Sequence, residues 1–550
     1  MKLSFNHKKI IIVTFYLISI LLVLFSYQDY GIHIEEKFHR LNGLYWLNYI
    51  SDIFGLVEFQ KIIEFKIGEI SDFSLSSITT YNKYGILIDI PSALLEILFN
   101  INEVKDIYYF KHLLSFFIFL LSSIFFFKII QQRFKNFFLS FLGLFLYITT
   151  PRILGDSFLY KDVLFLSFFS FTLYFFIKSL SKFNFKNLIF LAVFSALCVN
   201  LRIFAILIPL IFVLTITIKN FYINDYIDYL KKVIFYLFFF TVTLYIFWPY
   251  LWADPLSNFL KLFTSIKNDL VDIKILYDGD FISNKTLPDT YIFNWIFLTS
   301  PFLQTILFLF GYLYCVFRLL RRFINIKEKS FQNDLWRGRE EEVDFVCLIF
   351  LSLYYFFFIF LNAPLYNGWR LVYFFNIFIV YFIISFLHNL KNIFRKKKIN
   401  KFLFLITISL IGYNIYAITK THPFQSMYFN SLVSSETKNN YEGDYYGLAT
   451  KHFFEKILSE SNSELIKVAV ASHTPIQRGL EALPKKFRKR FEMMGQEYDR
   501  ADYIYKNNIS EVNSKIIKKY DIPKNFSKIY ELKIDEIILY EIFKSKKLNK

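Results

Sequence analysis

Long runs of Phe, Leu and Ile, each close to the length of a bilayer crossing, recur along most of the chain. A helix needs about 20 mostly apolar residues to cross the hydrocarbon core of a membrane. The runs therefore predict a mostly α, polytopic membrane protein with about eleven transmembrane helices. We place these helices near residues 10–27, 108–129, 136–150, 162–180, 186–201, 203–218, 233–249, 291–317, 344–362, 370–388 and 402–418.

One further apolar segment, 84–99, is short and carries Asp89 and Glu96. We expect it to form a helix that lies on the membrane and does not cross it. With that segment left out, basic clusters such as the one at Arg133 fall on the same side as the N-terminal lysines, as the positive-inside rule requires. This layout predicts a multi-pass protein of the inner (plasma) membrane, with a cytoplasmic N-terminus and an extracytoplasmic C-terminus.

The composition changes near residue 420, where the chain becomes polar. We predict a membrane domain over 1–419, with a first extracytoplasmic loop at 28–107 and a large loop at 249–290. Residues 420–550 are predicted to form a small extracytoplasmic α/β domain. Its expected elements are strands at 467–472 and 501–505, a hairpin across 529–542, and helices near 449–459 and 476–492.

Composition excludes several classes of protein. The chain is 55% hydrophobic with a mean hydropathy of +0.39, which is too apolar for a soluble protein of 550 residues. The net charge of +18 marks cytoplasmic loops in a membrane protein, so we expect no nucleic-acid partner. The three cysteines all fall in hydrophobic segments and give no disulfide framework or CxxC metal pattern.

The predicted topology gathers charged residues from distant parts of the sequence at the outer face. Among these residues, Arg202 lies at a tight turn between two predicted spans, and Arg370 begins the tenth span. A charge at membrane depth is costly, and it is usually paired or functional. These two arginines are therefore the most informative charges of the outer face.

The first loop holds the densest acidic cluster, with Asp29, Glu35 and Glu36 directly after the first span. We predict a helix from about Glu36, with Glu35 at its start, where the helix dipole favours an anion. Glu36 and Arg40 are four residues apart and could form a surface ion pair worth little, which is the structural alternative to a functional role of Glu36. Adjacent residues point roughly 100° apart on a helix, so Glu35 and Glu36 cannot share one role.

The outer-face arginines and carboxylates together suggest one kind of chemistry. Guanidinium groups bind phosphate oxygens in a bidentate manner, so Arg202 and Arg370 suit a phosphate at the membrane surface. A nearby carboxylate would accept the proton of a hydroxyl nucleophile. These parts describe a transferase whose donor carries a phosphate anchored in lipid.

Six segments, in order along the chain, carry a further signal, beginning with the acidic motif of the first loop. They are 29–36, 151–162, 248–255, 366–370, 422–430 and 442–447. Together they resemble motifs of GT-C membrane glycosyltransferases. The similarity is to bacterial relatives of protein O-mannosyltransferases and of the lipid A aminoarabinose transferase, which are glycosyltransferase family 39-like enzymes.

This resemblance implies an inverting transfer, on the outer face, from a polyprenyl-phosphate-linked sugar to a hydroxyl of a lipid, glycan or protein acceptor. The family's acidic pair is typically Asp-Glu, and here Glu35 stands at the Asp position. The implied catalytic residues are Glu35 as base, with Asp29 as its alternative, and Asp162 at a second acidic position. The candidate substrate-binding residues are Glu36, Lys161, Arg202, Arg370, Tyr366, Trp248 and Asp254. Some relatives bind a divalent metal, and that question stays open because the sequence has no cluster of metal-ligand spacing.

Two other functions compete with this interpretation. A transporter or lipid-sugar flippase would carry inverted repeats and charges near the bilayer midplane, and the sequence has neither. A sensor or assembly scaffold would leave the outer-face charges without a role.

Overall fold

The computed structural model describes residues 4–70, 85–159, 161–181, 184–220, 226–268, 272–324, 341–393, 397–509 and 520–549. Within these ranges, eight helices are long and apolar enough to cross a membrane. They are α1 (Phe5–Ser26), α6 (Val104–Phe134), α9 (Asp162–Ser181), α12 (Tyr226–Ile246), α15 (Phe302–Ile324), α17 (Glu342–Phe360), α18 (Phe375–Ile393) and α19 (Lys397–Thr421). The shorter apolar helices α7 (Phe137–Thr149), α10 (Phe185–Leu201) and α11 (Leu207–Asn220) complete the predicted eleven. The mostly α, polytopic fold class is therefore confirmed.

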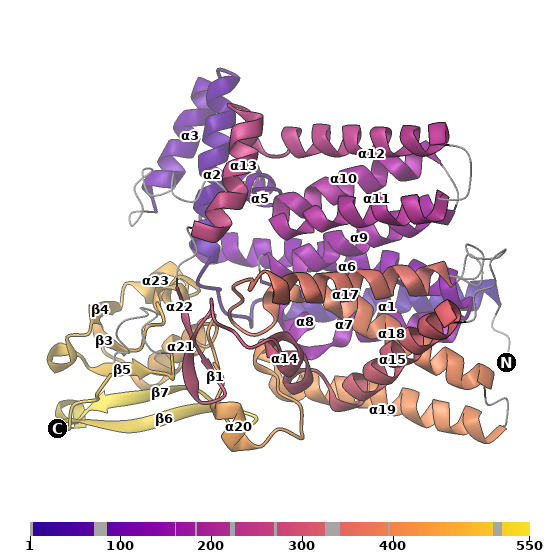
Figure 1. Ribbon diagram of the computed structural model, residues 1–550. Coiled ribbons are helices and arrows are strands. Elements are labelled where there is room, and N and C mark those ends of the chain that lie inside the picture. The colour runs from indigo at the N-terminus through magenta and orange to yellow at the C-terminus, as the bar shows by residue number, and fades with distance from the viewer. Residues whose placement is uncertain are drawn as a thin grey trace.

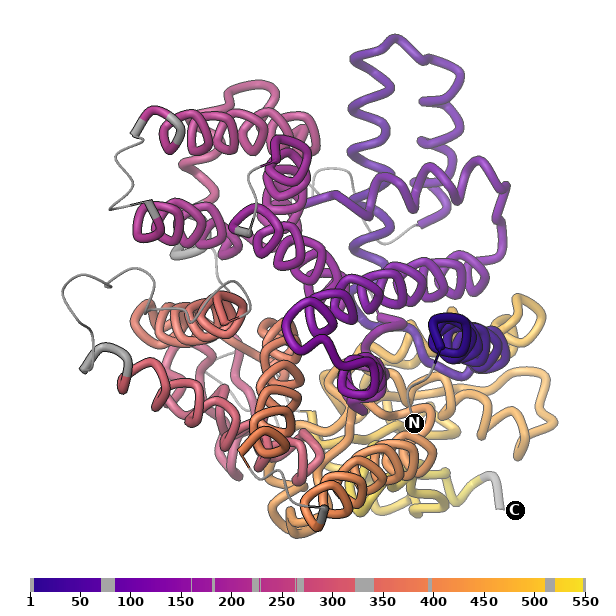
Figure 2. Tube along the Cα trace, turned by 90° about the vertical axis from the view of Figure 1, so that its right-hand side faces the viewer, coloured from indigo at the N-terminus to yellow at the C-terminus, as the bar shows by residue number. Residues whose placement is uncertain are grey.

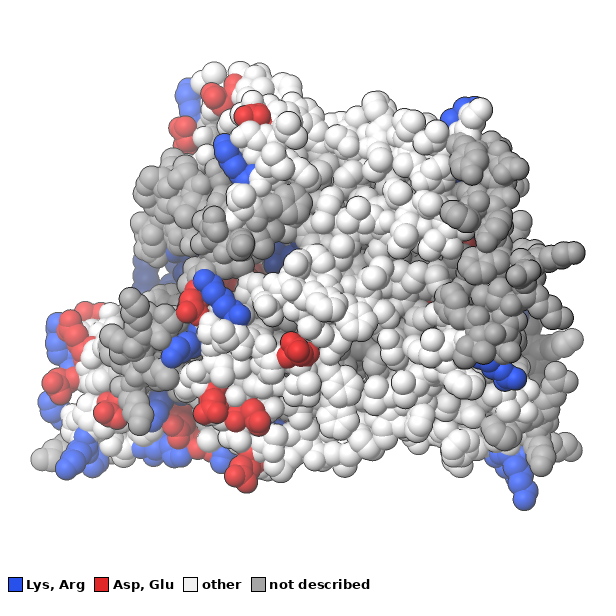
Figure 3. Space-filling model, viewed as in Figure 1, with Lys and Arg blue, Asp and Glu red and all other residues white. Residues whose placement is uncertain are grey.

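The long helices run side by side, and one end of this bundle carries the sheet (Figure 1). Figure 2, turned by 90°, shows many of the same helices nearly end-on. The surface over the bundle in Figure 3 is mostly uncharged, and Lys, Arg, Asp and Glu gather toward the two ends. An uncharged belt between charged ends is the surface expected of a protein with a bilayer around its middle.

Two predicted boundaries are wrong. The segment 291–317 is two helices, α14 (Tyr291–Thr299) and α15, because Pro301 has no N–H to continue the helix ladder. The tenth span begins at Phe375, and Arg370 lies before it in the 3-10 turn η5 (Arg370–Val372).

The first loop forms helices that lie across the sheet-bearing end of the bundle. They are α2 (Glu36–Ile53), α3 (Val57–Gly68) and α5 (Asp89–Leu98) (Figure 1). The predicted start of α2 at Glu36 is confirmed, and α5 is a ten-residue helix, as expected for a segment that does not cross. Leu41, Leu44, Ile63 and Ala93 are buried together and join the three helices.

The large loop is also structured. It contains the 3-10 turn η3 (Pro249–Leu251), α13 (Pro255–Asn268), and an antiparallel hairpin of β1 (Lys274–Tyr277) and β2 (Asp280–Ser283). The short helix α8 (Pro151–Asp156) follows α7 at the same end and packs against η6 (Gln425–Met427).

The C-terminal part contains a five-stranded mixed sheet in the order β4-β3-β5-β7-β6. The strands are β3 (Ile466–Ala471), β4 (Phe491–Gly495), β5 (Tyr503–Lys506), β6 (Phe526–Ile534) and β7 (Ile537–Ser545), and α21 (Thr450–Glu460) precedes them. The predicted single helix over 476–492 is wrong. That segment is α22 (Gln477–Glu481), α23 (Lys485–Arg488) and the start of β4, because Pro484 ends the helical pattern.

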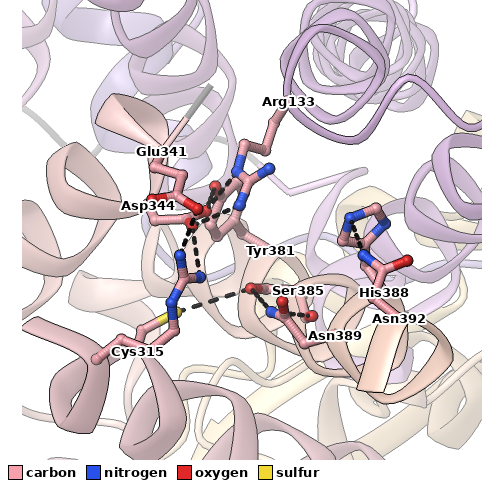
Figure 4. Close-up of polar contacts among 10 residues, drawn as sticks. Arg133, Cys315, Glu341, Asp344, Tyr381, Ser385, His388, Asn389 and Asn392 are labelled. Carbon is pink, nitrogen blue, oxygen red and sulfur yellow. Dashed lines mark hydrogen bonds and ion pairs between the residues drawn. The ribbon is translucent and has the colours of Figure 1, made fainter. Parts of the chain in front are cut away.

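An ionic network at the opposite end of the bundle joins four helices, since Arg318 of α15 also pairs with Asp344 (Figure 4). Arg133 of α6 donates to both carboxylate oxygens of Asp344 on α17, at 2.8 and 2.7 Å. Tyr381 of α18 also donates to Asp344. The bidentate pair neutralises both charges, so it connects these helices without leaving a buried charge unpaired.

Candidate functional site

Four charged residues from distant parts of the sequence meet at the sheet-bearing end of the bundle. Arg370 Nη2 donates to Glu35 Oε1 at 2.7 Å, although 335 positions separate the two residues. Arg370 Nε lies 3.6 Å from Asp162 Oδ2, and Arg202 donates to the other oxygen of Asp162. The two carboxylates therefore alternate with the two guanidinium groups, and all four residues are among those predicted to gather at the outer face.

Local structure explains how each of these residues reaches the cluster. Glu35 occupies the N-cap position of α2, where its side chain makes no capping hydrogen bond, and Asp162 is the first residue of α9. Arg202 ends α10 in an extended conformation, at the predicted turn. Arg370 follows a turn in which Gly368 has a φ of +73°, a conformation that glycine adopts without strain. Ends of helices and turns, rather than helix interiors, hold the charges.

Burial differs sharply between the two residues of the central ion pair. The Arg370 side chain is 1% exposed, whereas that of Glu35 is 34% exposed. Burial disfavours the Glu35 anion, but the charges of Arg370 and His33 and the hydrogen bond from Arg370 outweigh burial and hold its pKa well below the usual range. Glu35 is therefore an ionised carboxylate with one side open.

Lys161 also lies at this end of the bundle, where it is 4% exposed and precedes Asp162. Burial, and then the charge of Arg202, lower the pKa of Lys161 to about 7. An anion bound near Lys161 would favour its charged form.

Aromatic rings surround the Arg370 guanidinium. Its Cζ atom lies 4.7 Å from the ring centre of Tyr366 and 5.5 Å from that of Tyr446. Rings at these distances attract a cation electrostatically. Tyr366 was predicted at this site, whereas Tyr446 was not singled out, although it belongs to the family-like segment 442–447.

The C-terminal part of the chain fixes the first loop in place. Ile34 N–H donates to the carbonyl of Tyr446 at 3.2 Å. Gly31 passes so close to Leu448 that an added Cβ would lie 2.1 Å from its carbonyl oxygen, so only glycine fits there. Asp444 accepts hydrogen bonds from the N–H groups of residues 448 and 449 and orders this segment. The segment after α19 thus forms one wall of the site.

Two buried acids near Arg370 were not among the predicted site residues. Burial raises the pKa of Asp156, at the end of α8, to about 7. Burial also raises the pKa of Glu442, whose side chain accepts weakly from Leu276 N–H at 3.4 Å, to about 8. The sequence pointed to these two acids only through their positions in the family-like segments 151–162 and 442–447.

The predicted surface pair of Glu36 with Arg40 is wrong. Glu36 is buried, and its Oε1 accepts from His33 N–H at 2.8 Å and contacts His112 Nε2 at 3.0 Å. Arg40 instead forms a buried bidentate pair with Glu96 of α5. The pairing differs because α5 supplies Glu96 and α6 supplies His112, partners that sequence spacing cannot reveal.

Three other predicted residues lie apart from the four-residue cluster. Asp29 is half exposed and pairs with His422 at 2.9 Å. Asp254 is exposed, and its Oδ1 accepts from Ser257 N–H at 3.3 Å at the start of α13. Trp248 is buried immediately before η3. In the described ranges, no three His, Cys, Asp or Glu side chains are grouped as ligands for a metal ion.

Comparisons with known proteins give a similarity of structure and none of sequence. No family model and no curated protein match the sequence. Among the solved structures that are similar is the crystal structure of the Archaeoglobus fulgidus oligosaccharyltransferase in the apo form. The two chains are 10% identical, and the match has a TM-score of 0.40 and covers 77% of this chain and 62% of that chain. This chain therefore matches less than two thirds of the length of that protein.

Proposed function

We propose that this protein is an integral-membrane inverting glycosyltransferase that moves a sugar from a polyprenyl-phosphate-linked donor to an acceptor hydroxyl. The observation that carries the proposal is the contact between buried Arg370 and the half-open carboxylate of Glu35. A guanidinium group suits the donor phosphate, and a carboxylate suits the acceptor proton. Phosphate binding and proton acceptance are thus available side by side at one end of the membrane helices.

In the proposed reaction, the acceptor oxygen attacks the anomeric carbon from the face opposite the lipid phosphate. Glu35 takes the acceptor proton as the new carbon–oxygen bond forms. The bond between the anomeric carbon and the phosphate oxygen breaks, and its electron pair stays on the phosphate. Arg370 and Arg202 stabilise that charge, so the lipid phosphate leaves without a general acid.

Donor binding would also strengthen the base. In the free protein, Arg370 holds the pKa of Glu35 low, which makes Glu35 a weak base. A phosphate bound to Arg370 competes for its N–H groups and offsets its charge, so the pKa of Glu35 rises. Glu35 therefore becomes an effective base only when the donor is in place.

Asp162 acts in this proposal as a positioning residue. It accepts a hydrogen bond from Arg202 and faces Arg370, so its negative charge offsets the repulsion between the two guanidinium groups. Lys161 and Tyr366 are proposed to complete the phosphate site. Asp29 is the alternative base of this proposal, and Glu36, Trp248 and Asp254 would support substrate binding from outside the four-residue cluster.

We further propose that the sheet-bearing end is extracytoplasmic, that the protein resides in the inner (plasma) membrane, and that residues 1–419 and 420–550 form its two domains. The acceptor hydroxyl would belong to a lipid, a glycan or a protein. The 420–550 domain, which contacts the first loop through Tyr446, would border the acceptor path.

Gene deletion with complementation tests the function without knowledge of the sugar. The deletion strain should lack one sugar on a surface molecule and should accumulate the lipid-linked sugar, as measured by mass spectrometry. Wild-type protein should restore the sugar, and Glu35→Gln should not, at equal protein level. Glu58→Gln, which makes the same change on the exposed face of α3, is the matched control and should restore it. Full restoration by Glu35→Gln would exclude Glu35 as the base.

A further inference from the structure

His33 lies directly against the Arg370 guanidinium, in the first loop two residues before Glu35. It is 4% exposed, and its ring centre lies 4.6 Å from that of Tyr446. Its Nδ1 atom accepts the Glu35 N–H at 2.9 Å, and its Nε2 atom lies 3.3 Å from Arg370 Nη1. The imidazole is therefore fixed on both sides, with Nε2 directed at the cationic part of the site.

The two contacts require the imidazole hydrogen at different nitrogens. The bond from Glu35 N–H requires Nδ1 to accept, whereas a bond from Arg370 Nη1 would require Nε2 to accept. Burial, and also the charge of Arg370, lower the pKa of His33 to about 4, so the ring is neutral near pH 7. A neutral imidazole has one donor and one acceptor nitrogen. Because Nδ1 accepts the Glu35 N–H, Nε2 carries the hydrogen and faces Arg370 Nη1, which is also a donor. Two donors 3.3 Å apart with no acceptor between them form an incomplete hydrogen-bond arrangement.

Two further donors of the four-residue cluster also lack acceptors. Arg370 Nε and Arg202 Nε are buried and make no hydrogen bond with any described residue, since the 3.6 Å from Arg370 Nε to Asp162 is too long for one. Unsatisfied buried donors are rare in proteins and call for an explanation. An oxyanion would supply the missing acceptors, because each of its oxygens accepts more than one hydrogen bond.

We propose that His33 is a phosphate-binding residue, whose Nε2–H donates, together with Arg370 Nη1, to one oxygen of the donor's lipid phosphate. The inference rests on the proposed function for the identity of the ligand. The two nitrogens are 3.3 Å apart, so a single oxygen beside the line that joins them can lie about 2.8 Å from each. The hydrogen bond from Glu35 N–H to Nδ1 sets the tautomer, so the backbone of the base residue also directs a donor toward the leaving group.

Two substitutions separate phosphate binding from a purely structural role. In His33→Gln, the amide nitrogen reaches the position of Nε2 and keeps a donor there. In His33→Asn, the amide oxygen takes the position of Nδ1 and keeps the bond to Glu35 N–H, but no donor remains at Nε2. If His33 has only a structural role, His33→Asn should retain donor affinity better than His33→Gln. If His33 binds the phosphate, His33→Gln should retain it better.

Ligand-induced thermal stabilisation of the full-length purified protein measures binding without any sugar transfer. The probes are polyprenyl monophosphate, the matching polyprenol without phosphate, and inorganic phosphate. Polyprenyl monophosphate should stabilise the wild-type protein and His33→Gln similarly, and His33→Asn should bind it roughly ten- to a hundred-fold more weakly, as for a lost hydrogen bond to a charged group. Polyprenol should show no difference among the three proteins. Equal stabilisation by inorganic phosphate, with the same order of variants, would support the site but identify free phosphate as its ligand.

The outcomes distinguish the two proposals. If wild-type protein prefers polyprenyl monophosphate to polyprenol but His33→Asn binds it equally well, the role of His33 is refuted and the proposed function stands. If wild-type protein shows no preference for the phosphate, both are refuted. If binding follows the expected order while Glu35→Gln still transfers sugar, the His33 site stands and the role of Glu35 as base falls.

Discussion

The buried ion pair between Arg40 and Glu96 allows a quantitative test of how the first loop is held. Arg40 Nε lies 3.1 and 3.0 Å from the two Glu96 oxygens, and Nη2 lies 2.6 Å from Oε1. The two side chains are 4% and 1% exposed. Removing one partner of such a pair leaves an unpaired buried charge and costs about 3–5 kcal/mol. Arg40→Met should therefore destabilise α2 by that amount.

Hydrogen exchange of peptides from α2, measured by mass spectrometry in detergent, reports this local free energy. Protection in Arg40→Met should fall roughly 150- to 5,000-fold. The double variant Arg40→Met/Glu96→Met, which leaves neither charge, should recover most of it. Glu35 lies at the N-terminus of α2, so opening of this helix displaces the proposed base. We therefore expect kcat to fall together with protection.

An exposed ion pair in the same loop is the matched control. The side chains of Lys61 and Glu58 on α3 are 64% and 85% exposed, and such pairs are worth 0–1 kcal/mol. Lys61→Met should therefore change protection less than about fivefold. Unchanged protection in Arg40→Met would refute the claim that this ion pair stabilises α2. A double variant that loses as much protection as the two single variants lose together would refute it as well.

Two further predictions concern titration. Burial raises the pKa of Glu442 from 4.5 to about 8, so the folded state retains this proton and loses stability as pH rises from about 4.5 through 8. Glu442→Gln should therefore match wild type in Tm at pH 5 and exceed it at pH 8. Equal Tm values at pH 8 would refute the claim that burial keeps Glu442 protonated. Arg370 lowers the pKa of Glu35 in the free protein, so the acidic limb of kcat/KM should lie below pH 4.5 and that of kcat, with donor phosphate on Arg370, should lie higher; coincident limbs in pH–rate profiles would contradict this coupling.

The membrane helices were the most predictable part of the fold, because length and apolarity alone define a crossing. The break between α14 and α15 was missed because both pieces are apolar and only Pro301 marks it. In the C-terminal part, β4 was missed because Lys485 to Arg490 gave the segment a helical, charged appearance. Its strand character comes from parallel pairing with β3, a contact that lies outside the segment.

The site was predictable to the extent that topology brings charges to one end of the bundle. Arg202 and Arg370 were identified because a charge at membrane depth is costly. The partners of Glu36 and Arg40 were not, because His112 and Glu96 come from other helices. His33 was missed as well, since a histidine beside two acids gives no sign of which nitrogen will carry its hydrogen.

Sugar transfer by purified protein tests the central claim most directly. Wild-type protein in vesicles would be supplied with the lipid-linked sugar fraction and the envelope extract of the deletion strain, and release of polyprenyl phosphate and gain of sugar mass on an acceptor would be followed by mass spectrometry. Wild type and Glu58→Gln should release polyprenyl phosphate in step with acceptor glycosylation, and Glu35→Gln and Arg370→Met should do neither. Transfer by Glu35→Gln at the wild-type rate, or transport of the lipid-linked sugar across the vesicle without any transfer, would contradict the account.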